Sequence, residues 1–410
     1  MSVKSYLVNL KSKLDTNALK LPYTFVTGNQ SADMDSVVSA LTFAYFSNLR
    51  SSDQYVIPLI NIPKEDLKLR KDIVKLLSYH SITEDLLYFV EDFEKITGKS
   101  TDKILLNLVD HNNIQGEELH KAFNEGQVDT VGILDHHADE GEFLKADPRI
   151  IRTCGSNSSL VFNYFYDNFF HTDKDFLSKQ VDVLELLLGP LLIDTSCMTQ
   201  KVEEPDTKAF DAYKQGLSYS SGFQQLFVAD NDKSSIENFH ATLKSAKKDF
   251  SGFSFMDILR KDYKQFTFDK GDKVGFSSLG KSFKWIFTNY TKEEIEKTLG
   301  DALKVNNIDL LVMSDSFNRK DTNQYTREFA YYYEVQENNR FKSLGERAQK
   351  DLGLNDDIYG FDKIDATYQA VNEKGTFKLF NQGNTAASRK QIVPIVKNIL
   401  ESDNETENHL

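Results

Sequence analysis

Four apolar runs in this chain each lead into an aspartate or a histidine, and this feature does most to limit the folds that the chain can adopt. The runs end at residues 28–35, Asp110, Asp135-His136-His137 and Asp194. Buried strands of open α/β sheets present ligand-binding side chains at their carboxyl ends. Because all four endings offer a carboxylate or an imidazole, the sequence predicts a carboxylate-rich site that can hold two divalent metal ions.

The first half of the chain alternates short apolar runs with amphipathic helical patterns. Strands are expected at residues 23–27, 55–60, 86–90, 104–109 and 131–134, with helices such as 36–48 and 69–79 between them. This alternation is typical of a doubly wound, mainly parallel sheet. We therefore expect an α/β fold.

A loop-rich segment divides the chain. Residues 216–234 are rich in Gly, Ser, Asp and Asn, which is the composition of a connection between periodic blocks. The predicted organisation is a metal-binding domain at 1–217, a linker or hinge at 218–234 and a smaller C-terminal α/β domain at 235–410. A helix at 235–249 would open the second domain, and strands are expected at 310–313 and 327–335.

The charge balance restricts the partners. The formal net charge is -13, which argues against a general affinity for nucleic acid or acidic membranes. Residues 244–290 nevertheless hold ten lysines or arginines against five aspartates, so a polyanionic substrate could be bound locally. The chain has two cysteines, no apolar stretch of transmembrane length, and an amphipathic N-terminal segment that does not resemble a signal peptide. We expect a cytoplasmic protein.

The aspartates of the motifs have both functional and structural interpretations. Asp33 and Asp35 could aim two carboxylates at neighbouring metal positions, although Ser31 or Asp33 could simply cap the following helix. Asp110 closes the run ILLNLV, where a buried carboxylate needs a partner, and its two oxygens could bridge two metal ions. Asp194 follows a helical run, where its charge would oppose the helix dipole unless it bound a cation.

The adjacent histidines His136 and His137 could have different roles in the site. On an extended segment, His136 and His137 would point in opposite directions. One could then ligate a metal while the other faces the substrate, and Asp135 could accept a ring N–H and orient an imidazole. His111 could support the site or be a structural histidine.

Two basic residues follow a Gly-Asn turn near the end of the chain. Arg389 can grip phosphate oxygens with two N–H groups, and Lys390 can act as a point charge. A solvated basic turn is the simpler alternative.

Taken together, these motifs resemble the DHH phosphoesterase superfamily, in the branch with a DHHA2-type second domain. That branch includes family II inorganic pyrophosphatases, fungal exopolyphosphatases and prune-like proteins. The resemblance covers nearly the whole chain and rests on six matches in order: residues 29–35, Asp110, Asp135-His136-His137, Asp194-Thr195, Asp262-Tyr263-Lys264 and Ser388-Arg389-Lys390.

The resemblance implies a role for each matched residue and an active site in the interdomain cleft. The metal ligands would be Asp33, Asp35, Asp110, His136 and Asp194. The substrate contacts would be Asn29, His137, Lys264, Arg389 and Lys390, with Arg70 and His111 as further candidates. Asp110 and His137 are expected to act most directly on the reaction. A hinge in residues 218–234 would let domain closure assemble the basic side of the cleft.

Asn29 marks a departure within the superfamily. Pyrophosphatases of this branch carry a histidine there as a metal ligand, whereas Asn29 and residues 62–70 look like the fungal exopolyphosphatases. His111 points the other way, because it resembles the pyrophosphatases. Loss of an imidazole leaves an oxygen-dominated site, which suits Mg²⁺ better than Mn²⁺ or Co²⁺.

The sequence therefore predicts an exopolyphosphatase that acts as a monomer with two divalent ions, Mg²⁺ being expected and Mn²⁺ or Co²⁺ being possible. A metal-activated water would release the terminal phosphate of linear inorganic polyphosphate as orthophosphate. The alternatives are a family II-type inorganic pyrophosphatase and a prune-like nucleotide phosphodiesterase or interaction protein.

Overall fold

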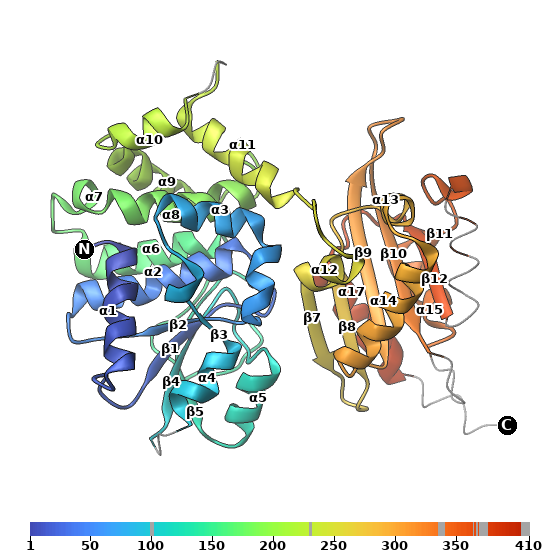
Figure 1. Cartoon of the computed structure of the whole chain (residues 1–410), viewed down its shortest axis with the longest axis horizontal. Helices are drawn as coiled ribbons and strands as arrows, with labels where there is room; N and C mark the ends of the chain where they lie inside the picture. The colour runs from blue at the N-terminus through green and yellow to red at the C-terminus, as the bar shows by residue number, and fades with distance from the viewer. Residues whose placement is uncertain are drawn as a thin grey trace. The chain divides into compact units, whose positions relative to one another are not determined.

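The structure is a computed structural model that describes residues 1–98, 102–228, 232–334, 341–363, 365, 368 and 376–402. The chain divides into two compact units, Met1–Asp249 and Phe250–Leu410. Each unit is built around its own sheet (Figure 1). The expected position of the active site in an interdomain cleft stays a prediction.

The first unit contains a six-stranded sheet in which every neighbouring pair is parallel. Its order is β3-β2-β1-β4-β5-β6. The strands are β1 (Thr24–Thr27), β2 (Ile57–Ile60), β3 (Tyr88–Phe89), β4 (Ile104–Val109), β5 (Val128–Asp135) and β6 (Arg149–Ile151). The prediction of a doubly wound parallel sheet is confirmed, although β6 was not expected.

Helices cover both faces of this sheet. Figure 1 shows α2 and α6 on one face, with α8 packed on these two helices, and α4 and α5 on the other face. The helices of the unit are α1 (Val3–Asp15), α2 (Met34–Arg50), α3 (Lys71–Tyr79), α4 (Val90–Thr97), α5 (Glu117–Asn124), α6 (Asn157–Phe165), α7 (Phe176–Lys179), α8 (Val181–Asp194), α9 (Glu204–Leu217), α10 (Ser221–Leu226) and α11 (Ser235–Lys247). Short 3₁₀ turns at Lys64–Leu69 and Glu84–Leu86, and a π turn at Tyr166–Phe170, complete it.

The strand order creates a switch point between β1 and β4. The chain leaves β1 for β2 on one side, and β4 later pairs with β1 on its other side. Ligands of open α/β sheets bind outside the carboxyl ends of the strands at such a point. Residue 28, Asp110 and His136 follow β1, β4 and β5, so the topology brings three of the four motifs to one edge.

The boundary between the units differs from the predicted linker. Residues 218–234 include α10, and α11 packs on α3 and α8 instead of opening the second domain. The reason is apolar burial, since Phe223, Phe239 and Leu243 belong to the core of the first unit. The division therefore falls after Asp249. Residues 229–231 of the predicted linker lie outside the described residues.

The second unit contains a mixed sheet with the order β11-β12-β10-β9-β8-β7, in which only β8 and β9 are parallel among the described strands. Its strands are β7 (Tyr263–Thr267), β8 (Lys273–Ser278), β9 (Leu310–Asn318), β10 (Tyr325–Tyr333), β11 (Leu354–Asn355) and β12 (Thr376–Gln382). Its helices are α12 (Phe255–Lys261), α13 (Phe283–Asn289), α14 (Lys292–Val305), α15 (Leu344–Leu352) and α17 (Arg389–Glu401), with a 3₁₀ turn at Phe361–Lys363. Residue 335 of the predicted strand 327–335 lies outside the described residues.

Two cores sandwich this second sheet. Alternate residues of β9 and β10 pack either against α12, α13 and α14 or against α15 and α17, as the period of two along a strand requires. Among the described residues, no helix has both the length and the apolar composition of a membrane span.

Candidate metal centre

Asp110 lies at the centre of the donor groups that the first sheet brings together. It follows β4 with a left-handed backbone (φ 62°), a conformation that aspartate tolerates better than most residues. One carboxylate oxygen, Oδ1, lies 3.0 Å from His136 Nε2 and 3.6 Å from His137 Nδ1. The other, Oδ2, accepts hydrogen bonds from Ser36 Oγ (2.6 Å) and Asn29 Nδ2 (2.8 Å).

The two histidines do not point in opposite directions, so that expectation was wrong. Their rings meet edge to face with centroids 4.6 Å apart, and both approach Asp110. The physical reason is that β5 ends at Asp135, so the chain has left the extended conformation on which the alternation depends.

Hydrogen bonds determine which ring nitrogen of His136 is available. Its Nδ1 lies 2.9 Å from the carbonyl oxygen of Cys154. Because a carbonyl can only accept, Nδ1 donates to Cys154, and Nε2 is the ring nitrogen that faces Asp110 and Asp35 (3.8 Å). Burial acts to lower the pKa of His136, but its hydrogen bonds with Asp110 and Cys154 outweigh burial and raise the pKa. Nε2 can therefore donate to Asp110 or, once deprotonated, offer its lone pair to a metal ion. This is the arrangement of a metal-ligating histidine.

Asp135 orients His137, as the sequence predicted. Its Oδ1 pairs with His137 Nδ1 at 2.8 Å and also accepts the backbone N–H groups of His136 and His137. Its Oδ2 accepts a hydrogen bond from Asn112, a residue that the sequence reasoning missed. Asp135 is fully buried, so these bonds fix the turn that carries both histidines.

The start of α6 and its N-cap hold Asp35, which was not predicted. Ser156 Oγ (2.7 Å) and the backbone N–H of Ser158 (2.8 Å) donate to its Oδ1, and the backbone N–H of Asn157 (2.6 Å) donates to its Oδ2. Asp35 thus caps the N-terminus of α6, where the helix dipole favours a negative charge. The available signal was the small, polar run Gly155–Ser159 ahead of an apolar helix.

The remaining acidic residues differ in their environments. Asp33 is the N-cap of α2, with Oδ1 accepting from the backbone N–H of Ser36 (3.0 Å), so the capping interpretation is confirmed. Asp194 ends α8, and its Oδ2 is buried with no hydrogen-bond partner among the described residues. A buried carboxylate oxygen of this kind is costly unless it binds a cation.

The electrostatics favour a cation. Burial, with the charges of Asp35 and Asp33, raises the pKa of Asp194 well above its usual range. Burial and then the charge of Asp110 raise the pKa of Asp35 to about 7. Burial also acts to raise the pKa of Asp110, but its hydrogen bond with His136 and the charge of that ring outweigh burial and lower the pKa. A divalent ion would relieve the repulsion among these carboxylates.

The donor set therefore fits a divalent metal. Asp110, His136 and His137 each offer a ligand atom, and the three atoms lie within 4.8 Å of one another. Asp35 adjoins this group through His136, the charge of Asp33 acts on Asp35, and the charges of Asp35 and Asp33 act on Asp194. Of the five predicted metal ligands, Asp110 and His136 belong to this group, and ligation by Asp33, Asp35 and Asp194 stays a prediction.

Two of the predicted substrate contacts, Asn29 and Arg70, are buried and hydrogen-bonded to neighbouring protein groups. Asn29, 3% exposed, uses its amide to donate to Asp110 and accepts from the backbone N–H of Ser31 (2.9 Å). Arg70, 4% exposed, donates to the backbone carbonyls of Ser31, Ala32 and Asp66. Its guanidinium supports the turn before Asp33 from inside the protein, so its surroundings do not support the predicted substrate contact.

His111 also has a structural position. It is buried, and its Nδ1 lies 2.9 Å from the carbonyl oxygen of Val109. This contact agrees with a structural histidine beside Asp110.

In the second unit the two matched motifs, residues 262–264 and 388–390, are hydrogen-bonded to each other. Arg389 Nη1 donates to the backbone carbonyl of Asp262 (2.8 Å), and Nη2 donates to Asp262 Oδ1 (2.7 Å). Lys264 follows on β7, and Arg389 and Lys390 open α17 after the N-cap Ser388. The Arg389 side chain is 17% exposed, which argues against a solvated basic turn. Cations at a helix N-terminus suit a phosphate group.

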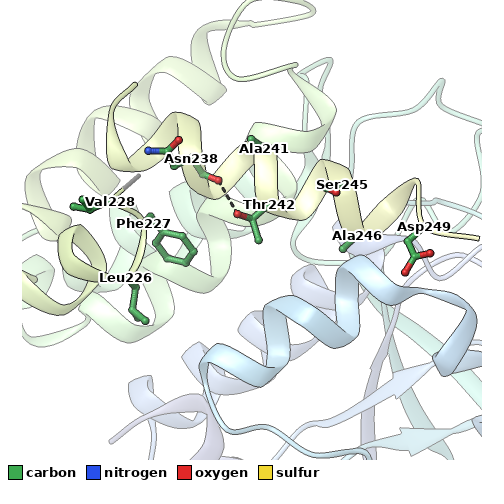
Figure 2. A pocket seen from close by; sticks show the side chains of 9 residues that line it. All are labelled: Leu226, Phe227, Val228, Asn238, Ala241, Thr242, Ser245, Ala246 and Asp249. Atoms are coloured by element: carbon green, nitrogen blue, oxygen red, sulfur yellow. Dashed lines mark hydrogen bonds between the residues drawn. The ribbon is translucent and has the colours of Figure 1, made fainter. Parts of the chain in front are cut away.

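A hollow of about 640 Å³ in the first unit is lined by other residues. Figure 2 shows it beside α10 and α11, with Thr242 Oγ1 donating to the carbonyl of Asn238 (2.9 Å). Its titratable lining residue, Asp249, forms an ion pair with Lys71 at 3.0 Å. The lining includes none of the motif residues, so we assign the chemistry to the carboxyl ends of β1, β4 and β5.

The fold and this donor set define the class of protein: the chain belongs to the DHH family, in the branch with a second DHHA2 domain. Residues 23–191 match the "DHH family, N-terminal domain" and residues 241–399 match the "DHHA2 domain". A Schizosaccharomyces pombe protein named "Putative exopolyphosphatase" is 33% identical over 95% of this chain and 94% of its own length.

Two other relatives extend the comparison. The mouse protein "Exopolyphosphatase PRUNE1" is 25% identical over 97% of this chain and 79% of its own length. The crystal structure of a Methanococcus jannaschii protein named "putative family II inorganic pyrophosphatase" shares the fold, with a TM-score of 0.54 and 21% identity over 92% of this chain and 99% of that one.

Proposed function

We propose that this protein is a metal-dependent exopolyphosphatase that releases orthophosphate from the end of linear inorganic polyphosphate. The observation that carries the proposal is the convergence of Asp110, His136 and His137 beside Asp35 at the switch point of the sheet. The similarity to the S. pombe protein supports the substrate class. We expect two divalent ions, with Mg²⁺ preferred over Mn²⁺ or Co²⁺ because most donors are oxygens.

When bound, the ions would supply an activated water and neutralise phosphate charge. The residues would divide the remaining work. His136 is 12% exposed and is turned toward the carboxylates, which suits a ligand, whereas His137 is 27% exposed. Because the carboxylate of Asp135 accepts from Nδ1 of His137, the Nε2 of that ring can exchange a proton. We propose that His137 Nε2 protonates or hydrogen-bonds the leaving phosphate oxygen.

The cations of the second unit would bind the phosphates of the chain. Asp262 holds the Arg389 guanidinium in a fixed orientation, which lowers the entropic cost of gripping phosphate oxygens. Lys264 and Lys390 would add point charges. We also propose that the protein acts as a monomer in the cytoplasm, which light scattering of the purified chain and imaging of a tagged copy would test.

A family II-type pyrophosphatase is the second candidate, since His111 resembles that group. Asn29 counts against it, because this position lacks the imidazole ligand of those enzymes. A prune-like nucleotide phosphodiesterase is the third candidate.

One experiment separates the three. Phosphate release is measured side by side from pyrophosphate, tripolyphosphate and long polyphosphate, and hydrolysis of cyclic AMP is followed in parallel, with Mg²⁺ and with Mn²⁺. We expect tripolyphosphate and long polyphosphate to be cleaved in preference to the other two. A preference for pyrophosphate would favour the second candidate, and hydrolysis of cyclic AMP alone would favour the third. The Asp110→Asn variant, prepared in parallel, shows whether the activity belongs to this site.

A further inference from the structure

Asp206 is a buried carboxylate outside every motif. It lies in the first turn of α9 and is 0% exposed. Its Oδ2 accepts the backbone N–H groups of Gly155 (2.6 Å) and Glu203 (2.9 Å). Its Oδ1 accepts the backbone N–H of Ser156 (3.2 Å) and the hydroxyl of Ser159 (2.9 Å). Four donors thus converge on the two oxygens, and three of them come from one short segment.

The same segment, residues 155–159, also holds Asp35. Ser156 is the shared residue, because its backbone N–H donates to Asp206 while its hydroxyl donates to Asp35. The N–H groups of Asn157 and Ser158 complete the contacts to Asp35. The segment therefore joins two carboxylates that lie far apart in the sequence, one a proposed metal ligand and the other not.

This segment also adjoins two other motifs. The carbonyl oxygen of Cys154, one residue earlier, lies 2.9 Å from His136 Nδ1. A Cβ added at Gly155 would lie 2.5 Å from Thr195 Cγ2 and 3.1 Å from Asp206 Oδ2. Because Thr195 follows Asp194, the backbone at Gly155 packs tightly between Asp206 and the end of the fourth motif.

We propose that Asp206 is a positioning residue that sets the affinity of the metal centre through residues 155–159 and Asp35. The proposal rests on the metal-dependent function proposed above. The physical reason is that a carboxylate can accept from all four of these donors, so Asp206 holds residues 155–159 in one conformation. An asparagine amide places hydrogens where two of these donors point, so Asp206→Asn disturbs the segment whichever way the amide turns.

The test is a titration of the full-length chain with Mn²⁺, read by isothermal calorimetry and independent of hydrolysis. We expect Asp206→Asn to weaken Mn²⁺ binding by about tenfold or more, as the loss of outer hydrogen-bonding partners does at other metal sites. The visible spectrum of bound Co²⁺ should also change, because Asp35 is reoriented. A purely structural role would lower the melting temperature and leave that spectrum unchanged.

Glu185→Gln is the matched control. Glu185 is a half-buried carboxylate of the same unit that accepts from Ser220 Oγ (3.0 Å). No hydrogen bond among the described residues joins it to the segment, so its Mn²⁺ affinity should equal that of the wild type. A folded Asp206→Asn protein with wild-type Mn²⁺ affinity and Co²⁺ spectrum would overturn the proposal.

If Asp206→Asn does not fold, Ser159→Ala replaces it, because this change removes one hydrogen bond to Asp206. We expect roughly threefold weaker Mn²⁺ binding, the effect of one net hydrogen bond, and no change would overturn the proposal. The two hypotheses fail separately. A wild type that binds Mn²⁺ without cleaving polyphosphate refutes the proposed function and still allows the test of Asp206.

Discussion

Replacing Asp110 with asparagine removes a negative charge from the centre of the donor set while keeping the shape of the side chain. Ser36 Oγ and Asn29 Nδ2 both donate to Oδ2, so the amide oxygen of the variant must face them. The amide NH₂ then takes the place of Oδ1, 3.0 Å from His136 Nε2. An amide nitrogen offers no lone pair to a metal, so both the ligand and its charge are lost.

The size of the effect follows from the lost charge. At about 4 Å and an effective dielectric constant of about 20, two unit charges interact with about 4 kcal/mol. Since about 1.4 kcal/mol corresponds to a factor of ten, we expect turnover to fall at least about a thousandfold. The loss of a principal electrostatic group has effects of this order in other enzymes.

The assay is orthophosphate release from polyphosphate at saturating Mg²⁺, with circular dichroism and thermal unfolding to verify the fold. Asp182→Asn is the matched control, because Asp182, on α8, pairs with His80 at the end of α3 and is 45% exposed. The control should keep wild-type activity. More than a tenth of wild-type turnover in a folded, metal-saturated Asp110→Asn protein would refute the metal-binding role of Asp110.

Three further predictions concern metal preference, substrate binding and stability. Asn29→His should raise kcat/KM for pyrophosphate relative to polyphosphate, most clearly with Co²⁺, because an imidazole suits that metal; an unchanged or lower ratio contradicts this. Arg389→Gln should raise KM for polyphosphate and leave the Mn²⁺ affinity of the first unit unchanged, and the reverse pattern would show that Arg389 serves the metal. Burial raises the pKa of Glu328 to about 8 and that of Asp315 to about 7. In the unfolded chain the pKa values of these carboxyl groups are about 4. Their contribution to the stability of the second unit should therefore be fully present below about pH 4, and it should be lost as the pH rises through their folded-state pKa values of about 7 and about 8. Glu328→Gln should flatten this loss in the thermal unfolding followed by fluorescence of Trp285, the single tryptophan, and an unchanged pH dependence would count against these pKa shifts.

Several features of the site could be predicted because they depend on residues adjacent in sequence. An apolar run followed by Asp110 specifies a buried strand with a polar end, and the same local pattern identified β1 and β5. The helix cap formed by Asp33 could be predicted for the same reason, because a capping residue and its helix are adjacent in sequence. Strands such as β6 and β7 were missed because their residues are only partly buried and show no clear apolar alternation.

Tertiary structure decided what distant segments do to one another. The sequence by itself determined which donors lie at strand ends and in what order. It could not show that His136 and His137 turn toward the same carboxylate, that Arg389 rests on Asp262, or that Arg70 faces inward. The domain boundary was predicted at the wrong place for a similar reason. The apolar face of α11 packs on α3 and α8, which precede it in the sequence, and the sequence alone did not show this contact. Contacts of this kind depend on packing and hydrogen bonding across long sequence separations, and no local pattern of residues encodes them.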